Sequence, residues 1–235
     1  EFIDCMYDLF KEKTNKRVSS FKDMVYSDLG ESIAEKFLIP YNEKLYACDL
    51  DSLDHEAMGR FFPKTTKEEI ISNFKNKNTD SYNDFFVYPT GGAIEYVNSL
   101  FKNVDETKLT LEEELIKIDV EKKIAYTNLR EISYNRLISS MPFPKLLSLC
   151  EIKYEKNDFS WNKVLVFNLG FDLPADYNKN SWVYIPDPEI SFYRIGFYNT
   201  IIGSDKLSMY IELGFSKDEE IGDVSIHLKR VLDDL

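Results

Sequence analysis

The segment WVYIPDPEISFYRIGFY, residues 182–198, decides the fold of this 235-residue chain. Aromatic and polar residues alternate in Trp182–Ile185 and again in Phe192–Tyr198. A period of two predicts β-strands with one face toward a core. The turn residues Pro186–Pro188 separate the two runs, so an antiparallel arrangement is expected.

Neighbouring segments extend this pattern on both sides. Val164–Leu169 is an apolar run, and Met209–Phe215 alternates again after a turn at Gly203-Ser204. Residues 217–234 carry apolar side chains at helical spacing among many acids, which predicts an amphipathic helix. The last third of the chain is therefore expected to be a small antiparallel sheet, packed by helices on one face.

The N-terminal part of the chain shows helical periodicity. A second helix is predicted to begin at Ser19 or Ser20 and to end at Gly30. A third helical segment is predicted to stop at Pro40, because a residue that precedes proline is disfavoured in the helical region.

The middle of the chain mixes strand and helix signals, and the whole chain is therefore predicted to be α+β. The expected elements are a strand at Phe85–Tyr88, a turn at Pro89–Gly92, a helix at Ala93–Phe101, strands at Glu114–Asp119, Lys123–Thr127 and Leu137–Ser140, and a helix at Pro144–Cys150. The apolar side chains of the 93–101 helix are expected to point inward.

Charge excludes several classes of partner. The chain has 29 Lys and Arg against 41 Asp and Glu, for a formal net charge of -12. Such a chain is repelled by nucleic-acid backbones and by anionic membranes, so neither is an expected partner. No apolar run reaches the roughly 20 residues that a membrane span requires.

Cysteine and histidine are scarce. Cys5, Cys48 and Cys150 form no CxxC pattern, which indicates reduced thiols and a cytoplasmic location. His55 and His227 lie far apart in sequence without ligand spacing, so no metal site is expected. No Ser/His/Asp or Cys/His catalytic set can be assembled, and no pair of acids stands out.

Two features have the chemistry of an anion site. Gly91-Gly92 precedes a predicted helix, where a glycine turn allows close approach of a ligand, although a plain tight turn is the better explanation of the pair alone. Arg194 lies inside an aromatic strand and could bind a phosphate or carboxylate through its fork of donors. The alternative is a salt bridge to an acid such as Glu212, and the sequence leaves both open.

Five short segments occur in an order that is typical of one superfamily. They are PYNEKLYA (40–47), FVYPTGG (86–92), YNRLISSMP (134–142), WVYIP with FYR (182–186 and 192–194), and SMYIE (208–212). They resemble segments of the FAD-dependent amine-oxidase-like superfamily, closest to UDP-galactopyranose mutase-like and protoporphyrinogen-oxidase-like proteins. The similar region covers about residues 20–215.

This resemblance implies a particular division of the chain. The family binds FAD through an N-terminal GxGxxG segment that this sequence lacks, so the chain is expected to be the central part of a longer flavoprotein and not to retain FAD alone. Residues 1–84 would be the helical part of a substrate domain, 85–150 a returning fragment of the FAD-binding domain, and 151–235 the antiparallel substrate-domain sheet and final helix. Because the FAD-domain portion is incomplete, association into a homo-oligomer is a further expectation.

The resemblance also implies two sets of binding residues. Those expected at the substrate are Arg194 at the diphosphate, Tyr184 beside it, Arg60 as a second basic contact, Tyr46 at a family tryptophan position, and Asn83 at the nucleotide. Those expected at FAD are Gly91, Gly92 and the backbone of Leu115. No catalytic residue is singled out.

Three functions are compatible with these residues. The first is the substrate-binding portion of a flavin-dependent mutase that acts on a nucleotide-sugar in polysaccharide synthesis. The second is an FAD-dependent oxidoreductase with another substrate, which is favoured where the sequence departs from the mutases: Tyr46 replaces tryptophan, and Arg60 aligns only with a one-residue shift. The third is a non-catalytic binding module. In the first two, the enzyme is the longer protein and this portion alone is expected to be inactive.

Overall fold

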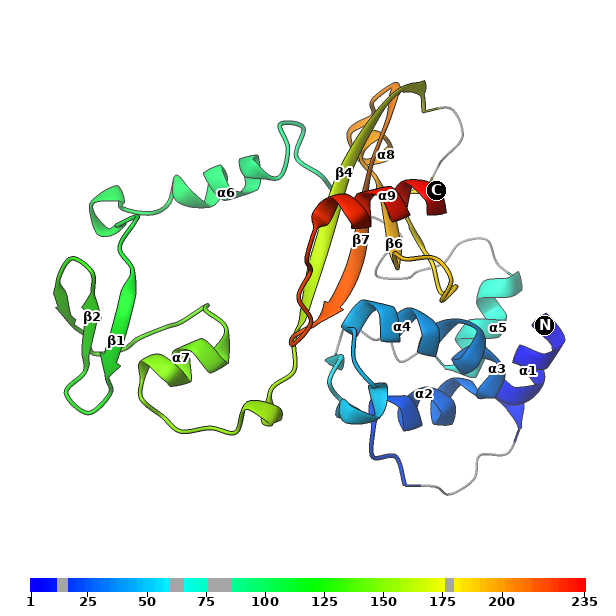
Figure 1. The fold of residues 1–235 in the computed structure, drawn as a ribbon, viewed down its shortest axis with the longest axis horizontal. Coiled ribbons are helices and arrows are strands. Elements are labelled where there is room, and N and C mark those ends of the chain that lie inside the picture. The colour runs from blue at the N-terminus through cyan, green and yellow to red at the C-terminus, as the bar shows by residue number, and fades with distance from the viewer. Residues whose placement is uncertain (12–16, 60–65, 76–85, 176–179) are drawn as a thin grey trace. The chain divides into compact units, whose positions relative to one another are not determined.

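A computed structural model describes residues 1–11, 17–59, 66–75, 86–175 and 180–235. The chain forms two compact units (Figure 1): residues 1–90 with 161–235, and residues 91–160. Helices and two antiparallel sheets are present, so the predicted α+β class is confirmed.

A four-stranded antiparallel sheet organises the first unit. Its strands are β4 (Asn162–Pro174), β5 (Trp182–Tyr184), β6 (Arg194–Phe197) and β7 (Lys206–Ser216), in the spatial order β4-β7-β6-β5. The period-two runs of the sequence therefore form strands as predicted. The long strands β4 and β7 pair over most of their length (Figure 1).

One face of this sheet carries the larger core. Val183, Ile195, Ile211 and Phe167 lie opposite one another across the four strands. This face packs against α9 (Val224–Asp234), whose Val231 is fully buried in the same cluster. The helix begins later than the predicted residue 217, because its N-cap is Asp223, whose side chain accepts a hydrogen bond from the Ser225 amide.

Two rows of residues lie on the other face of the sheet. Tyr184, Arg194, Glu212 and Val166 are in register across the strands, and so are Trp182, Gly196, Tyr210 and Asn168. Residues two apart along a strand project from the same face, so both rows share it.

The helix α4 (Ile39–Tyr46) meets this second face at Gly214 of β7. A Cβ atom at Gly214 would overlap the backbone carbonyl oxygen of Lys44. Asn162 Nδ2 donates to the neighbouring carbonyl of Leu45, and Lys44 Nζ donates to the carbonyls of Ile185 and Asp187 at 3.0 and 2.8 Å. The absence of a side chain at Gly214 thus sets how closely α4 approaches the sheet.

A second core of this unit is formed by α2 (Phe21–Leu29), the π-helical turn η1 (Ala34–Leu38), α4 and the 3-10 turn η2 (Leu50–Ser52). The unit also contains the helices α1 (Phe2–Phe10), α3 (Glu31–Ile33), α5 (Lys67–Lys75) and α8 (Tyr198–Ile202). Phe21, Val25 and Leu50 are fully buried in this core. Ser20 caps α2 by accepting from the Asp23 amide, and Gly30 ends it at φ 82°, both as predicted.

The prediction that Pro40 ends the third helix is wrong. The chain stays helical from Glu31 to Tyr46, with Pro40 at the start of α4. The wide turn at Ala34–Leu38 explains this, because the Ile39 amide donates five residues back to Ala34 and the extra residue relieves the crowding that proline causes in a regular helix.

The second unit contains α6 (Ile94–Phe101), the strands β1 (Leu115–Asp119), β2 (Ile124–Thr127) and β3 (Glu131–Ser133), α7 (Phe143–Leu149), and 3-10 turns η4 (Glu106–Lys108) and η5 (Lys156–Asp158). The strands form an antiparallel sheet in the order β1-β2-β3. The prediction of a strand at Leu137–Ser140 is wrong, because Glu131–Ser133 pairs with β2 instead. Phe86–Tyr88, the described part of the other predicted strand, lies in the first unit and pairs with no strand there.

The apolar face of α6 is exposed, which corrects the prediction that it points inward. Ile94, Val97 and Leu100 are 58%, 41% and 54% exposed. Within the described residues of this unit, only Ile118 and Ala125 are buried hydrophobic residues.

The close approach of α4 to the sheet gives a test by substitution. Gly214→Ala is expected to lower the free energy of unfolding by about 1–3 kcal/mol, because a backbone carbonyl must move away. Gly170→Ala on β4, where no atom lies within 4 Å of the new Cβ, serves as the matched control and should not be destabilised. Urea unfolding of both variants measures the difference, and equal stability of the two would contradict this account.

Candidate functional site

The face of the four-stranded sheet that carries the rows of Arg194 and Gly196 is called the polar sheet face. An ion pair between Arg194 and Glu212 forms its centre. Arg194 Nη2 lies 2.6 Å from Glu212 Oε1, between the paired strands β6 and β7. The two side chains are 33% and 11% exposed. Arg194 Nε is buried without a hydrogen-bond partner among the described residues. The salt bridge therefore exists, and donors of the guanidinium remain beyond it.

Four tyrosines surround this pair. Tyr184 lies opposite Arg194 on β5, and the Tyr210 ring centre is 5.9 Å from Arg194 Cζ. Tyr41 of α4 meets Tyr184 and Tyr193 edge-on, at ring-centre distances of 5.0 and 6.2 Å. Helix and sheet thus bring phenol rings around one guanidinium.

Burial sets the protonation states of these groups. Burial raises the pKa of Tyr41 and Tyr193, and the nearby charge of Glu212 adds to the increase for both. Burial alone would lower the pKa of Arg194, but its hydrogen bond to Glu212 and the charge of that carboxylate outweigh this, so the pKa is raised. At neutral pH Arg194 is therefore a cation, which is a suitable donor for phosphate or carboxylate oxygens, and Tyr41 and Tyr193 keep their protons.

Several of these residues received no role from the sequence. Tyr41 and Phe37 stack at a ring-centre distance of 5.6 Å with planes 1° apart, which their i,i+4 spacing on a helix allows. That spacing was hidden by the predicted end of the helix at Pro40. Tyr210 and Tyr193 adjoin Arg194 through strand register, which alternation within each strand does not determine.

Tyr46 lies in the core of the helices. Its ring packs edge-on against Phe21 at 6.3 Å, and its hydroxyl donates to the sulfur of Met58. Burial raises the pKa of the Tyr46 hydroxyl. The structure thus brings Tyr184 and Arg194 together and places the Tyr46 side chain against the helices. The predicted contacts Arg60 and Asn83 lie outside the described residues.

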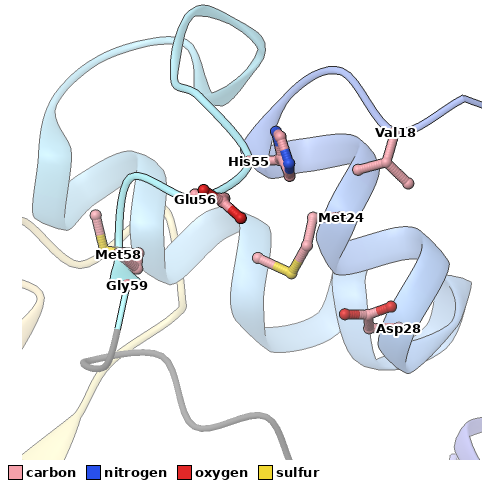
Figure 2. A pocket seen from close by; sticks show the side chains of 7 residues that line it. All are labelled: Val18, Met24, Asp28, His55, Glu56, Met58 and Gly59. Atoms are coloured by element: carbon pink, nitrogen blue, oxygen red, sulfur yellow. The ribbon is translucent and has the colours of Figure 1, made fainter.

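A pocket of about 490 Å³ lies beside this helical core (Figure 2). It opens between α2 and the segment 55–59, and its lining consists of Val18, Met24, Asp28, His55, Glu56, Met58 and Gly59. Met58 both lines the pocket and receives the Tyr46 hydroxyl. The volume falls in the range of small-molecule sites.

The residues expected at FAD lie in the second unit. Gly92 has φ 92°, and no atom lies within 4 Å of the position that a Cβ would occupy. Its carbonyl accepts from the Glu95 amide at 3.0 Å, at the entry to α6. Leu115 begins β1 opposite Thr127. Gly91 differs from Gly92, because a Cβ atom there would lie 2.6 Å from Glu95 Cγ, so only the Gly92 side of the turn is open.

Among the described residues, no cluster of three or more His, Cys, Asp or Glu side chains could hold a metal ion. His227 Nε2 lies 2.6 Å from the carbonyl oxygen of Ile221, and His55 Nδ1 lies 3.6 Å from Asp54. The described helices include none whose length and apolar character suit a bilayer crossing.

Comparisons with known proteins rest on structure. No protein-family model and no curated protein matches the sequence. A crystal structure of reduced UDP-galactopyranose mutase matches over 98% of this chain, with TM-score 0.77 and 21% identity. A structural-genomics structure of a Pyrococcus furiosus protein matches over 94%, with TM-score 0.56 and 15% identity. The chain spans 55% of each of these proteins, and the likeness shows that it shares their fold over that part.

Lys44, which ties α4 to the segment after β5, gives a pH test. Burial lowers the pKa of Lys44 from an ordinary 10.5 to about 8, although the charges of Asp187 and Asp234 oppose this change. Between these values the unfolded chain holds more protons at this site, so stability increases with pH. The cost of burying the ammonium is present in full below pH 8 and is lost toward pH 10.5.

The matched variant for this test is Lys44→Met, which carries no charge at any pH. The wild-type free energy of unfolding minus that of the variant should rise between pH 8 and 10, as measured by urea unfolding. Taking the difference removes the contribution of the tyrosines. A difference that stays constant with pH would rule out a strongly shifted Lys44.

Proposed function

We propose that this chain is the substrate-binding portion of a longer flavin-dependent enzyme resembling UDP-galactopyranose mutase, which acts on a nucleotide-sugar in polysaccharide synthesis. The observation that supports it most is the shared fold over 98% of the chain with that mutase. The Arg194 cluster lies on the sheet segments, 182–186, 192–194 and 208–212, that carry the sequence resemblance.

The proposed substrate site uses the chemistry of the polar sheet face. Arg194 is fixed by Glu212 yet one-third exposed, and it would contact the diphosphate with Tyr184 beside it. A charged guanidinium donates to phosphate oxygens through its planar fork of N–H groups, and a phenol hydroxyl can donate beside it. As the resemblance implies, Arg60 is proposed as a second basic contact, Asn83 at the nucleotide, and Tyr46 at the family tryptophan position near the uridine and the flavin. The task of these groups is to orient the sugar and the diphosphate.

The proposed cofactor site belongs to the second unit. Gly91, Gly92 and Leu115 would contact FAD in the full-length protein, where the exposed apolar face of α6 would pack against the remainder of the FAD-binding domain. FAD would supply the electron-rich ring needed for isomerisation, or the hydride acceptor needed for oxidation. Cytoplasmic location and homo-oligomerisation remain predictions.

An FAD-dependent oxidoreductase with a different substrate is the second candidate. The observation that favours it is Tyr46, which replaces the tryptophan of the mutases and packs within the helical core. Such an enzyme would share the flavin but would be indifferent to UDP. A titration of the full-length protein with UDP therefore separates the two candidates.

The first test measures UDP affinity of the full-length protein by isothermal titration calorimetry. Arg194→Ala should weaken binding about 10–100-fold, since one charge-assisted contact contributes about 1.5–3 kcal/mol. Arg130→Ala is the control, because Arg130 forms a similar pair with Glu113, at 2.9 Å, in the second unit. Unchanged affinity in Arg194→Ala, or no UDP binding by the wild type, would overturn the nucleotide-sugar proposal.

The second test is the visible absorption spectrum of the purified full-length protein. Oxidised-flavin bands are expected, and their perturbation by UDP would favour the mutase over the oxidoreductase. A colourless protein that develops no bands on addition of FAD would exclude both flavoenzyme candidates and favour a binding module.

A further inference from the structure

Gly196 occupies a special position on the polar sheet face. In its row across the strands it lies between Trp182 and Tyr210, and its neighbour in the other row is Arg194. A Cβ atom at Gly196 would overlap three atoms of the Tyr210 side chain, Cζ, Cε1 and Oη. The far end of the Tyr210 ring therefore lies directly over the backbone of β6.

The Tyr210 ring is held in this place from its other side as well. The Tyr198 ring centre lies 5.1 Å from that of Tyr210, and the Tyr198 hydroxyl donates to Asn168 Oδ1 at 2.8 Å. The ring thus lies between the Tyr198 side chain and the Arg194 guanidinium, to which its centre is 5.9 Å distant. At this distance a ring face attracts a cation.

Arg194 is then restrained by two different contacts. Glu212 binds Nη2 at 2.6 Å, and the Tyr210 ring lies beside the guanidinium. Arg194 Nε, which is buried, has no acceptor among the described residues, so a salt bridge to a single nitrogen leaves the rotation of the plane to be set by packing. The ring supplies that packing only because Gly196 leaves room for it.

We infer that Gly196 is a positioning residue that admits the Tyr210 ring beneath the Arg194 guanidinium and thereby fixes the orientation in which Arg194 meets an anionic ligand. The identity of the ligand as a nucleoside diphosphate rests on the proposed function. The orientation of the guanidinium does not depend on that function, and it can be measured without any ligand.

The experiment records the Nε–Hε resonance of Arg194 by ¹H–¹⁵N NMR in the full-length protein, assigned by its loss in Arg194→Lys. The buried Nε–H predicts a resonance protected from solvent exchange in the wild type and in Gly170→Ala, the control glycine with open space around it. Gly196→Ala should shift or broaden that resonance. Tyr210→Leu should also shift or broaden the Arg194 resonance, without crowding β6. If Gly196→Ala fails to fold, Tyr210→Leu alone tests the inference.

The conservative variant Tyr210→Phe distinguishes an effect on the orientation of Arg194 from a general loss of stability. Tyr210→Phe keeps the ring and loses only the hydroxyl, so it should keep the Arg194 resonance and the wild-type UDP affinity. Gly196→Ala and Tyr210→Leu should weaken UDP binding about threefold or more, as expected for loss of a cation–ring contact.

The outcomes distinguish the inference from the function on which its ligand rests. An Arg194 resonance that is unchanged in both Gly196→Ala and Tyr210→Leu would overturn the inference, whatever the UDP affinity. A shifted resonance with unchanged UDP affinity would overturn the link to the ligand. A shifted resonance in a protein that never binds UDP would support the positioning role and exclude the nucleotide-sugar proposal.

Discussion

The register of β7 between β4 and β6 is the constraint on which the first unit depends. It places Ile211 between Phe167 and Ile195 on the core face, and Glu212 beside Arg194 on the polar face. Because side chains alternate along a strand, a slip by one residue would bring Glu212 into the core. Core packing and ion pairing therefore select the same register, and each supports the other.

The polar sheet face combines a partly buried ion pair with aromatic rings that surround it. Taking Arg194 and Glu212 partly out of water costs most of what their attraction returns, so the pair adds little net stability. Its effect is geometric, since a cross-strand carboxylate and a flanking ring restrict a long, flexible side chain. Two glycines make this arrangement possible: Gly214 admits α4, which brings Tyr41, and Gly196 admits the ring of Tyr210.

The two units differ in how they satisfy their apolar surface. The first has a sheet-and-α9 core and a separate helical core, with fully buried residues such as Ile211 and Phe21 in each. The second exposes the apolar face of α6 and buries little among its described residues. The solved structures that share this fold match the chain over 55% of their own length.

The sequence by itself determined the strands of the four-stranded sheet and several helix ends, because these depend on local physics, whereas it misplaced a strand at Leu137–Ser140 and missed β3. Alternation located β5, β6 and β7, and the capping chemistry of Ser20 and Gly30 bounded α2. The Arg194–Glu212 salt bridge was one of two alternatives that the sequence left open for Arg194, and the pairing of β6 with β7 shows that it forms.

Only the tertiary structure decided the features that depend on partners distant in sequence. The passage of a helix through Pro40 requires a π turn stabilised by packing, and the exposure of α6 follows from what the rest of the unit fails to cover. Tyr41 and Tyr210 join Arg194 because a helix docks at one glycine and a ring lies over another. Local periodicity specifies which face a side chain takes along its own element, whereas its neighbours across elements are set by register and packing in three dimensions.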